Sequence, residues 1–387
     1  MAIMPDQALY VILPVPEWQA KLGLGMTDVG ILLSVNRFVR LLTNHWAERL
    51  VRKVNATVLF VCVLVLGAGV AAMYGAWPIM WVMLIGRVLW GLCWSVIRQV
   101  GIMTAVDTAG GDKVASVVGF YNGLSRSGSI VGMLAAGWLC DSVGFRYCFW
   151  LIGCGSLLGV IPGAIARRGV EGHPSEFRKV RESRPTDNFR SLLICGFAAG
   201  CVGTGMIVPT LGYVLARGFA GKIAIIATIN GLVLALRYGI LSLGSPLLGG
   251  VVDRIGDRRA AFAFSCVGTG ILVAVTAVSL PANVVMTIIL LVLVMAFFVC
   301  GTGLLVALTS EAGRYGSKTF SWYITASDMG AACGPLLAWA MLDKLREPVA
   351  VYAVGSALFM LGTVFALGRM RRQVDRGGAG DVPAGGE

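Results

Sequence analysis

The sequence predicts an all-α polytopic membrane protein with twelve transmembrane helices in two six-helix halves. Its mean hydropathy is +0.80 and only 13% of its 387 residues are charged, whereas an ordinary soluble domain carries about 25% charged residues. Apolar runs of about 20 residues recur along the chain, and this is the length that a helix needs to cross about 30 Å of hydrocarbon. A polar, basic segment separates six runs from six. These observations exclude one large soluble core.

The first run is shorter than a full span. Residues 2–16 give at most about 24 Å of helix, and Pro14 and Pro16 shorten it further. No basic segment precedes the run and no small-residue cleavage site follows it, so we do not expect a signal peptide. We predict a shortened first helix, followed by spans at 27–46, 57–77, 78–105, 115–139, 147–166, 191–216, 223–248, 261–280, 284–309, 320–342 and 349–368.

The central connection divides the chain into similar halves. Shifting the sequence by 201 places Gly30 on Gly231, and shifting it by 202 places Gly128 on Gly330 and Asp141 on Asp343. A nearly constant offset in two separate regions indicates an internal duplication. We therefore predict an N-terminal bundle over 1–166, a basic cytoplasmic linker over 167–190, a C-terminal bundle over 191–369 and a disordered cytoplasmic tail over 370–387.

The distribution of basic residues predicts the orientation in the membrane. Of the 32 Lys and Arg residues, 20 lie in alternate connections and the tail, on one predicted face, against 6 on the other. This bias is typical of polytopic membrane proteins, whose cytoplasmic loops are basic. It predicts both termini in the cytoplasm and accounts for the net charge of +12 without nucleic acid as a partner. The lipid bilayer and a small-molecule solute are the expected partners.

Several classes of chemistry are disfavoured by the residues present. The ten cysteines are scattered without a C-x-x-C pair, and only two histidines occur, at His45 and His173. A disulfide framework, a metal centre and a bound cofactor are therefore not expected. No clustered catalytic acids, G-x-S-x-G elbow or H-E-x-x-H pair is present, so we do not expect an enzyme.

A charged loop between the eighth and ninth spans carries the most specific motif. Its pattern resembles the loop signature of the major facilitator superfamily, G-x-x-x-D-R-x-G-x-R-R, with Arg87-x-x-x-Gly91 and Gly330-x-x-x-Gly334-Pro335 as weaker matches. The resemblance implies a secondary transporter with a site between the two halves that opens alternately to each side. We expect the loop to be either a solvated turn or a latch formed in one access state; its motif residues are Gly249, Asp253, Arg254, Gly256, Arg258 and Arg259.

Eight charged residues lie well inside the predicted spans, six of them arginine. Each costs about 2.5–3.5 kcal/mol on insertion scales, so each needs a partner, water or a function. By helical rise, most lie about 12–21 Å into their spans, whereas Arg98 is expected near the cytoplasmic rim as an anchor. The two aspartates cannot neutralise the six arginines; the set is Arg37, Arg40, Arg87, Arg98, Arg126, Arg237, Asp6 and Asp328.

In the family that the chain resembles, the second span faces the eleventh and the fifth faces the eighth. This implies that Arg37 or Arg40 meets Asp328 across one seam, while Arg126 and Arg237 meet across the other. We hypothesise that Arg37, Arg87, Arg126 and Arg237 bind an anionic group of the substrate, because guanidinium grips carboxylate or phosphate in bidentate fashion. The alternative is that these arginines cap carbonyls or bind water.

Coupling to a proton gradient is expected at aspartate. We hypothesise that Asp6 and Asp328 carry protons and that Arg40 takes part in coupling or gating; a static ion pair between the halves is the alternative for Asp328. The predicted function is proton-coupled transport of a small organic anion by a monomer in a bacterial cytoplasmic membrane. A proton-coupled efflux pump for drug-like or amphiphilic compounds and a non-transporting sensor or scaffold remain as alternatives.

Overall fold

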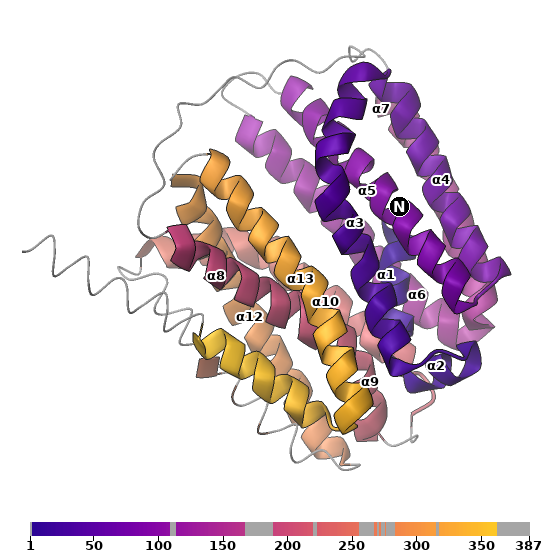
Figure 1. The fold of residues 1–387 in the computed structure, drawn as a ribbon, viewed down its shortest axis with the longest axis vertical. Coiled ribbons are helices and arrows are strands. Elements are labelled where there is room, and N and C mark those ends of the chain that lie inside the picture. Colours follow the sequence, from indigo (N-terminus) through magenta and orange to yellow (C-terminus); the bar gives the residue numbers. More distant parts are fainter. Residues whose placement is uncertain are drawn as a thin grey trace, which may run out of the picture.

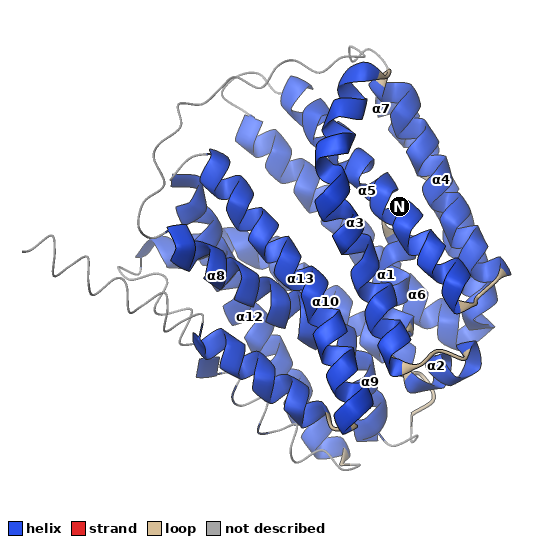
Figure 2. Ribbon diagram, viewed as in Figure 1, coloured by secondary structure: helices blue, strands red, loops and turns tan. Residues whose placement is uncertain are grey.

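The computed structural model describes residues 2–108, 114–166, 189–219, 223–254, 283–314 and 317–361, together with 267–268, 271 and 275. Within these residues the chain is helical and contains no strand, as Figure 2 shows. The helices are α1 (Met4–Ile12), α2 (Pro16–Leu22), α3 (Met26–Lys53), α4 (Ala56–Ala76), α5 (Met80–Thr108), α6 (Val114–Leu158), α7 (Val160–Ala166), α8 (Phe189–Ala199), the π-helix η2 (Gly200–Ile207), α9 (Val208–Phe219), α10 (Ile226–Arg254), α12 (Val284–Arg314) and α13 (Ser317–Leu345).

The predicted all-α membrane fold is confirmed. Among the described residues, six helices are long and apolar enough to cross a membrane, and a seventh span arises if α2 and α3, bent by 94°, are taken together. A further apolar helix covers Pro348–Leu361. The predicted span 261–280 lies almost entirely outside the described residues, as do the tail 370–387 and the linker 167–190 except for its last two residues, which begin α8.

The long helix α6 contains two predicted spans joined by a tight turn. Gly144 has φ 85° and ψ 168°, a conformation that a residue with a Cβ rarely adopts. The chain reverses direction at Gly144, as the hydrogen bond from the Cys148 thiol to the Ala136 carbonyl at 3.6 Å shows. Residues 114–143 and 145–158 are therefore neighbouring spans, as the sequence predicts for 115–139 and 147–166.

Prolines explain why α1 ends at Ile12. Pro14 has no N–H to continue the helix, and the Val15 N–H bonds to the Ile12 carbonyl at 3.0 Å instead of to Val11. The Val11 carbonyl is thereby freed, and it accepts from the Asn230 side chain of the other half at 2.8 Å. All nine residues of α1 are buried, so this helix is a central element of the molecule.

Two helix pairs join the halves along opposite seams. In Figure 1, α3 runs beside α13, and α6 packs along α10 on the other seam. Within the halves, α5 lies between α3 and α4, while α13 packs on α8 and η2. These seams are the pairings of second with eleventh and fifth with eighth span that the family resemblance implies.

An aspartate–threonine contact closes each seam at the same end. The Asp141 carboxylate accepts from both the backbone N–H and the hydroxyl of Thr228, each at 2.7 Å, in the first turn of α10. On the other seam, the Thr27 hydroxyl in the first turn of α3 donates to the Asp343 carboxylate at 3.0 Å. A carboxylate at a helix N-terminus satisfies free N–H groups and the positive end of the helix dipole.

Candidate functional site

Three of the predicted arginines converge from both halves of the molecule. Arg37 lies on α3, Arg126 on α6 and Arg237 on α10. The Tyr238 phenol is within electrostatic range of all three guanidinium groups. Arg37 and Arg126 are also close enough to Arg237 to repel it. The structure thus brings Arg126 and Arg237 near each other, with Arg37 as a third cation.

Each of these arginines is held by a neutral partner. Arg37 Nε donates to the Tyr10 hydroxyl at 2.9 Å, and Arg237 Nη2 donates to Thr204 Oγ1 at 3.1 Å. Arg126 Nη1 donates to the Leu241 carbonyl at 3.4 Å. No described carboxylate forms an ion pair with any of the three. The cluster therefore carries three positive charges without a described ion-pair partner, and Asp328 acts on Arg37 only at longer range.

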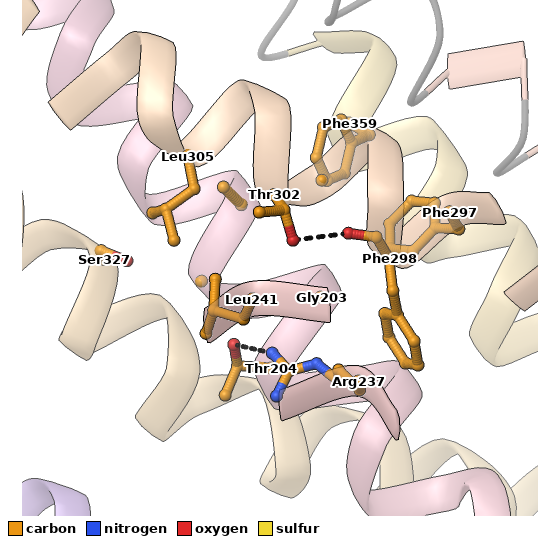
Figure 3. A pocket seen from close by; sticks show the side chains of 13 residues that line it. Gly203, Thr204, Arg237, Leu241, Phe297, Phe298, Thr302, Leu305, Ser327 and Phe359 are labelled. Carbon is orange, nitrogen blue, oxygen red and sulfur yellow. Dashed lines mark hydrogen bonds between the residues drawn. The ribbon is translucent and has the colours of Figure 1, made fainter. Parts of the chain in front are cut away.

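A cavity of about 170 Å³ lies beside Arg237 within the C-terminal half, as Figure 3 shows. Its walls include the rings of Phe297, Phe298 and Phe359, and Thr204 and Thr302 add hydroxyl groups. The Arg237 guanidinium carbon lies 5.2 Å from the centre of the Phe298 ring, within the range of a cation–π contact. Ligand pockets commonly enclose about 300–1,000 Å³, so this cavity suits the apolar part of a ligand.

The wall of the cavity includes a π-helix. Glycines at 200, 203 and 205 make η2 slender, and a Cβ on Gly330 of α13 would lie 2.1 Å from the Phe197 carbonyl oxygen. π-Helical segments are rare and are frequently found at functional sites. The segment brings Thr204 to Arg237, and the Gly330-x-x-x-Gly334 motif lets α13 approach α8 and η2.

Arg87 does not join the arginine cluster. We expected it there, but the structure buries it completely and pairs it with Asp6, which is 9% exposed. Arg87 Nε also donates to the Leu32 carbonyl at 2.6 Å, and Asn36 Nδ2 donates to Asp6 at 2.9 Å. A buried charge needs an opposite charge and hydrogen bonds. Asp6 supplies this opposite charge to Arg87, whereas the arginine cluster contains only positive charges.

Tyr10 connects the buried ion pair with the cluster. Its ring centre lies 5.6 Å from the Arg87 guanidinium carbon and 5.4 Å from that of Arg37. Its hydroxyl accepts from Arg37 and donates to the Leu33 carbonyl at 2.9 Å. A change in the charge of Asp6 can therefore reach Arg37 through two adjacent side chains.

Asp328 forms its ion pair with Arg98, which is a correction to the expected pairing with Arg37 or Arg40. The Arg98 Nη1 to Asp328 Oδ2 distance is 3.9 Å, and both side chains are about one third exposed. Arg37 and Arg40 feel the Asp328 charge, but Arg40 stacks on Trp94 at 5.9 Å. Helix α5 continues to Thr108, so Arg98 lies about 15 Å before its end; its place at the cytoplasmic rim stays a prediction.

The charged loop motif lies largely outside the described residues. Helix α10 continues to Arg254, so Gly249, Asp253 and Arg254 belong to its last turns. Their side chains, and Gly256, Arg258 and Arg259, are outside the described part of the chain. The latch hypothesis for this loop stays a prediction.

Sequence reasoning missed the neutral partners of the charges. Of these partners, Asn36 could most easily be found from the sequence, because an amide next to Arg37 in the middle of a span is itself costly in lipid. Tyr10, Thr204 and the phenylalanine walls have no signal that separates them from ordinary helix-packing residues. Their role depends on which helices meet.

The comparisons with known proteins agree with this geometry. The family model described as Major Facilitator Superfamily matches residues 1–229. The chain belongs to the major facilitator superfamily. Similarity to solved superfamily structures extends over the whole fold: a bacterial homologue of the human lysosomal transporter Spinster, inward-facing and occupied, has a TM-score of 0.76 at 13% identity and covers 96% of this chain and 94% of that one. A bacterial homologue of the iron transporter ferroportin has a TM-score of 0.69 at 14% identity, covering 94% of each chain.

Curated relatives share low sequence identity with this chain. "Multidrug resistance protein MdtG" of Escherichia coli (strain SMS-3-5 / SECEC) is 23% identical over 350 residues, 89% of this chain and 85% of the relative. The protein of the same name from Salmonella heidelberg (strain SL476) is 23% identical over 298 residues, 76% of this chain and 73% of the relative. The chain is thus an integral membrane transporter of the superfamily.

Proposed function

We propose that the protein is a proton-coupled secondary transporter of amphiphilic organic anions, working by alternating access in the bacterial cytoplasmic membrane with both termini in the cytoplasm. The observation that carries this proposal is the meeting of Arg37, Arg126 and Arg237 without a described carboxylate partner. A solute anion would complete the charge balance, and both halves would contact it, as alternating access requires.

The aromatic cavity beside Arg237 supports an amphiphilic solute. An anionic head bound by the guanidinium groups would leave its apolar part next to Phe297 and Phe298. Desolvated apolar surface gains about 25 cal/mol per Å², so this contact adds affinity without demanding one shape of ligand. Orientation of the solute would come from the arginines.

The buried pair of Asp6 and Arg87 supports proton coupling. Protonation of Asp6 removes the charge that holds Arg87 and weakens the bond from Asn36. Tyr10 contacts both Arg87 and Arg37, so the state of Asp6 affects the cluster that binds the solute. One proton and one anion would therefore be linked through a short chain of contacts.

A second function, export of drug-like amphiphiles, is favoured by the name of the MdtG relatives and by the aromatic cavity. The two functions differ in the charge of the solute. An export pump for cations would bind poorly beside three guanidinium groups, because like charges repel at this range.

The test is ligand-induced thermal stabilisation of the purified protein with matched pairs of amphiphiles, an arylalkyl carboxylate and the corresponding amine. We expect stabilisation by the carboxylate, at least tenfold weaker binding in Arg237→Gln because a charge-assisted hydrogen bond contributes about 1.5–3 kcal/mol, and no change in Lys344→Gln. Stabilisation by the amine alone, or equal carboxylate binding by Arg237→Gln, would refute the anion site.

A further inference from the structure

A second, larger groove lies on the outer side of the N-terminal half, away from the arginine cluster. It encloses about 530 Å³ between the end of α3 and the helices α4 and α5, within the size range of ligand pockets, about 300–1,000 Å³. Helix α5 forms its floor because α5 packs on both α3 and α4, which make few contacts with each other. Its lining is mainly apolar and includes Trp46, Leu50, Val63, Leu66 and Leu92.

Large apolar side chains of the groove face outward. Trp46 is 74% exposed, and Leu66 and Leu92 are 45% and 41% exposed. From Thr43 to Lys53, the part of α3 that lines the groove is about 15 Å long, which equals the hydrocarbon depth of one leaflet of a bilayer about 30 Å thick. The groove therefore has the length and polarity to hold an acyl chain.

Two cations stand at one end of the groove. Arg49 and Lys53 line it, lie one helical turn apart, and are both exposed. Neither forms an ion pair with a described carboxylate. This is the end that the distribution of Lys and Arg in the sequence assigns to the cytoplasm, where the lipid surface is anionic.

We propose that this groove binds an anionic phospholipid of the cytoplasmic leaflet. Arg49 and Lys53 contact its phosphodiester and headgroup, while one acyl chain lies along Trp46, Val63 and Leu66. Guanidinium and ammonium together match a headgroup with net negative charge. A zwitterionic headgroup gains less, because its own ammonium group competes with the two cations for the phosphate. The site is independent of the solute and proton sites.

The experiment measures tryptophan quenching in the full-length protein reconstituted in phosphatidylcholine vesicles. Phosphatidylglycerol with brominated acyl chains quenches nearby indole rings, and the component due to Trp46 is the difference between the wild type and Trp46→Phe. We expect half-maximal quenching of Trp46 at a tenfold or more lower mole fraction of brominated phosphatidylglycerol than of brominated phosphatidylcholine. Trp138 is the control, since it is 63% exposed on α6 and is expected to respond equally to both lipids.

The double variant Arg49→Gln/Lys53→Gln isolates the headgroup contact. Each basic residue near an anionic surface strengthens binding severalfold, so the pair is expected to contribute about 10- to 30-fold, and the preference of Trp46 for phosphatidylglycerol is expected to disappear. Arg190→Gln/Lys344→Gln removes two other exposed cations and is expected to keep the preference. Equal quenching by both lipids in the wild type, or a preference unchanged in the groove variant, would overturn the proposal; native mass spectrometry of retained lipid gives the same comparison for a variant with altered fluorescence.

Discussion

Asp6 and Arg87 are the clearest case of one residue determining the place of another. An arginine that is wholly buried in a membrane protein needs a counter-charge, and Asp6 of α1 provides it together with the Leu32 carbonyl. Asn36 and Gln7 complete the hydrogen bonding of the carboxylate, at 2.9 and 3.1 Å. The resulting network fixes α1 against α3 and α5.

Replacing Asp6 by Asn is expected to abolish substrate-driven proton movement in liposomes, because the amide has no proton to exchange. The matched variant Asp328→Asn is expected to retain proton movement. Asp328 is one third exposed and its ion pair is with Arg98, at 3.9 Å, and not with Arg87. The readout is a pH-sensitive dye inside the vesicles.

Loss of Asp6 also leaves Arg87 buried without its partner, which costs about 3–5 kcal/mol. The double variant Asp6→Asn/Arg87→Gln removes the unpaired charge and is expected to recover thermal stability without proton movement. Proton movement by either stable variant would show that Asp6 is not the coupling residue.

At the scale of single residues, the sequence shows which charged side chains are costly in a membrane span, but it does not show which side chains they contact. Charges in apolar spans are visible as costly residues, and the expected proximity of Arg126 and Arg237 is found. Arg37, which the sequence places on the other seam, is a third cation near Arg237; the role of all three in solute binding stays a prediction. The misplacement of Arg87 and the pairing of Arg98 with Asp328 have one cause. A side chain of arginine reaches several ångströms in any direction, and rise along a helix gives only its depth.

Elements of the fold are more predictable than contacts, because hydropathy and length determine where helices cross a membrane. The span boundaries agree with α3, α4, α5, α12 and α13. The π-helix η2 was not predicted, because the glycines of residues 200–205 are also common in ordinary membrane helices. Its contact with α13 is a tertiary feature that the glycine pattern does not specify.

The contact of α8 and η2 with α13 predicts a sharp difference between two glycines. In Gly330→Ala the new Cβ would lie 2.1 Å from the Phe197 carbonyl oxygen, so α13 must shift and unfolding is expected to become easier by about 1–3 kcal/mol or more. Gly239→Ala on α10 meets no atom within 4 Å and is expected to be neutral. Thermal unfolding in detergent measures both, and equal melting temperatures would contradict the tight contact.

At the scale of the whole molecule, the two seams are closed by equivalent contacts. The sequence offsets of 201 and 202 relate Thr27 to Thr228 and Asp141 to Asp343, and the structure joins Asp141 to Thr228 and Thr27 to Asp343. Each half thus contributes one carboxylate and one helix N-terminus. The duplication was predictable from the sequence, whereas the exchange of partners between halves required the three-dimensional arrangement.

If the halves move as rigid bodies, loosening one seam must loosen the other. Asp141→Ala removes charge-assisted bonds of about 1.5–3 kcal/mol and is expected to raise hydrogen exchange about tenfold or more in peptides containing Thr228 and also in those containing Thr27. Hydrogen–deuterium exchange with mass spectrometry measures both regions. An increase confined to Thr228 would contradict rigid-body motion.

Asp28 provides the control for this experiment. Its carboxylate accepts from the Gly25 N–H at 2.9 Å, a contact inside one half. Asp28→Ala is therefore expected to raise exchange near the start of α3 and to leave Thr228 unchanged.

The end of α1 at Ile12 has a mechanical consequence. A continuous helix would use the Val11 carbonyl for its own backbone, but termination at Pro14 leaves that oxygen to Asn230 on α10. One peptide group thus ties the opening turns of the chain to the opposite bundle at a point where both bundles converge. Because this hydrogen bond lies close to the axis about which the bundles tilt, a large tilt displaces it little. Helix α1 can therefore serve as the pivot of the transport cycle.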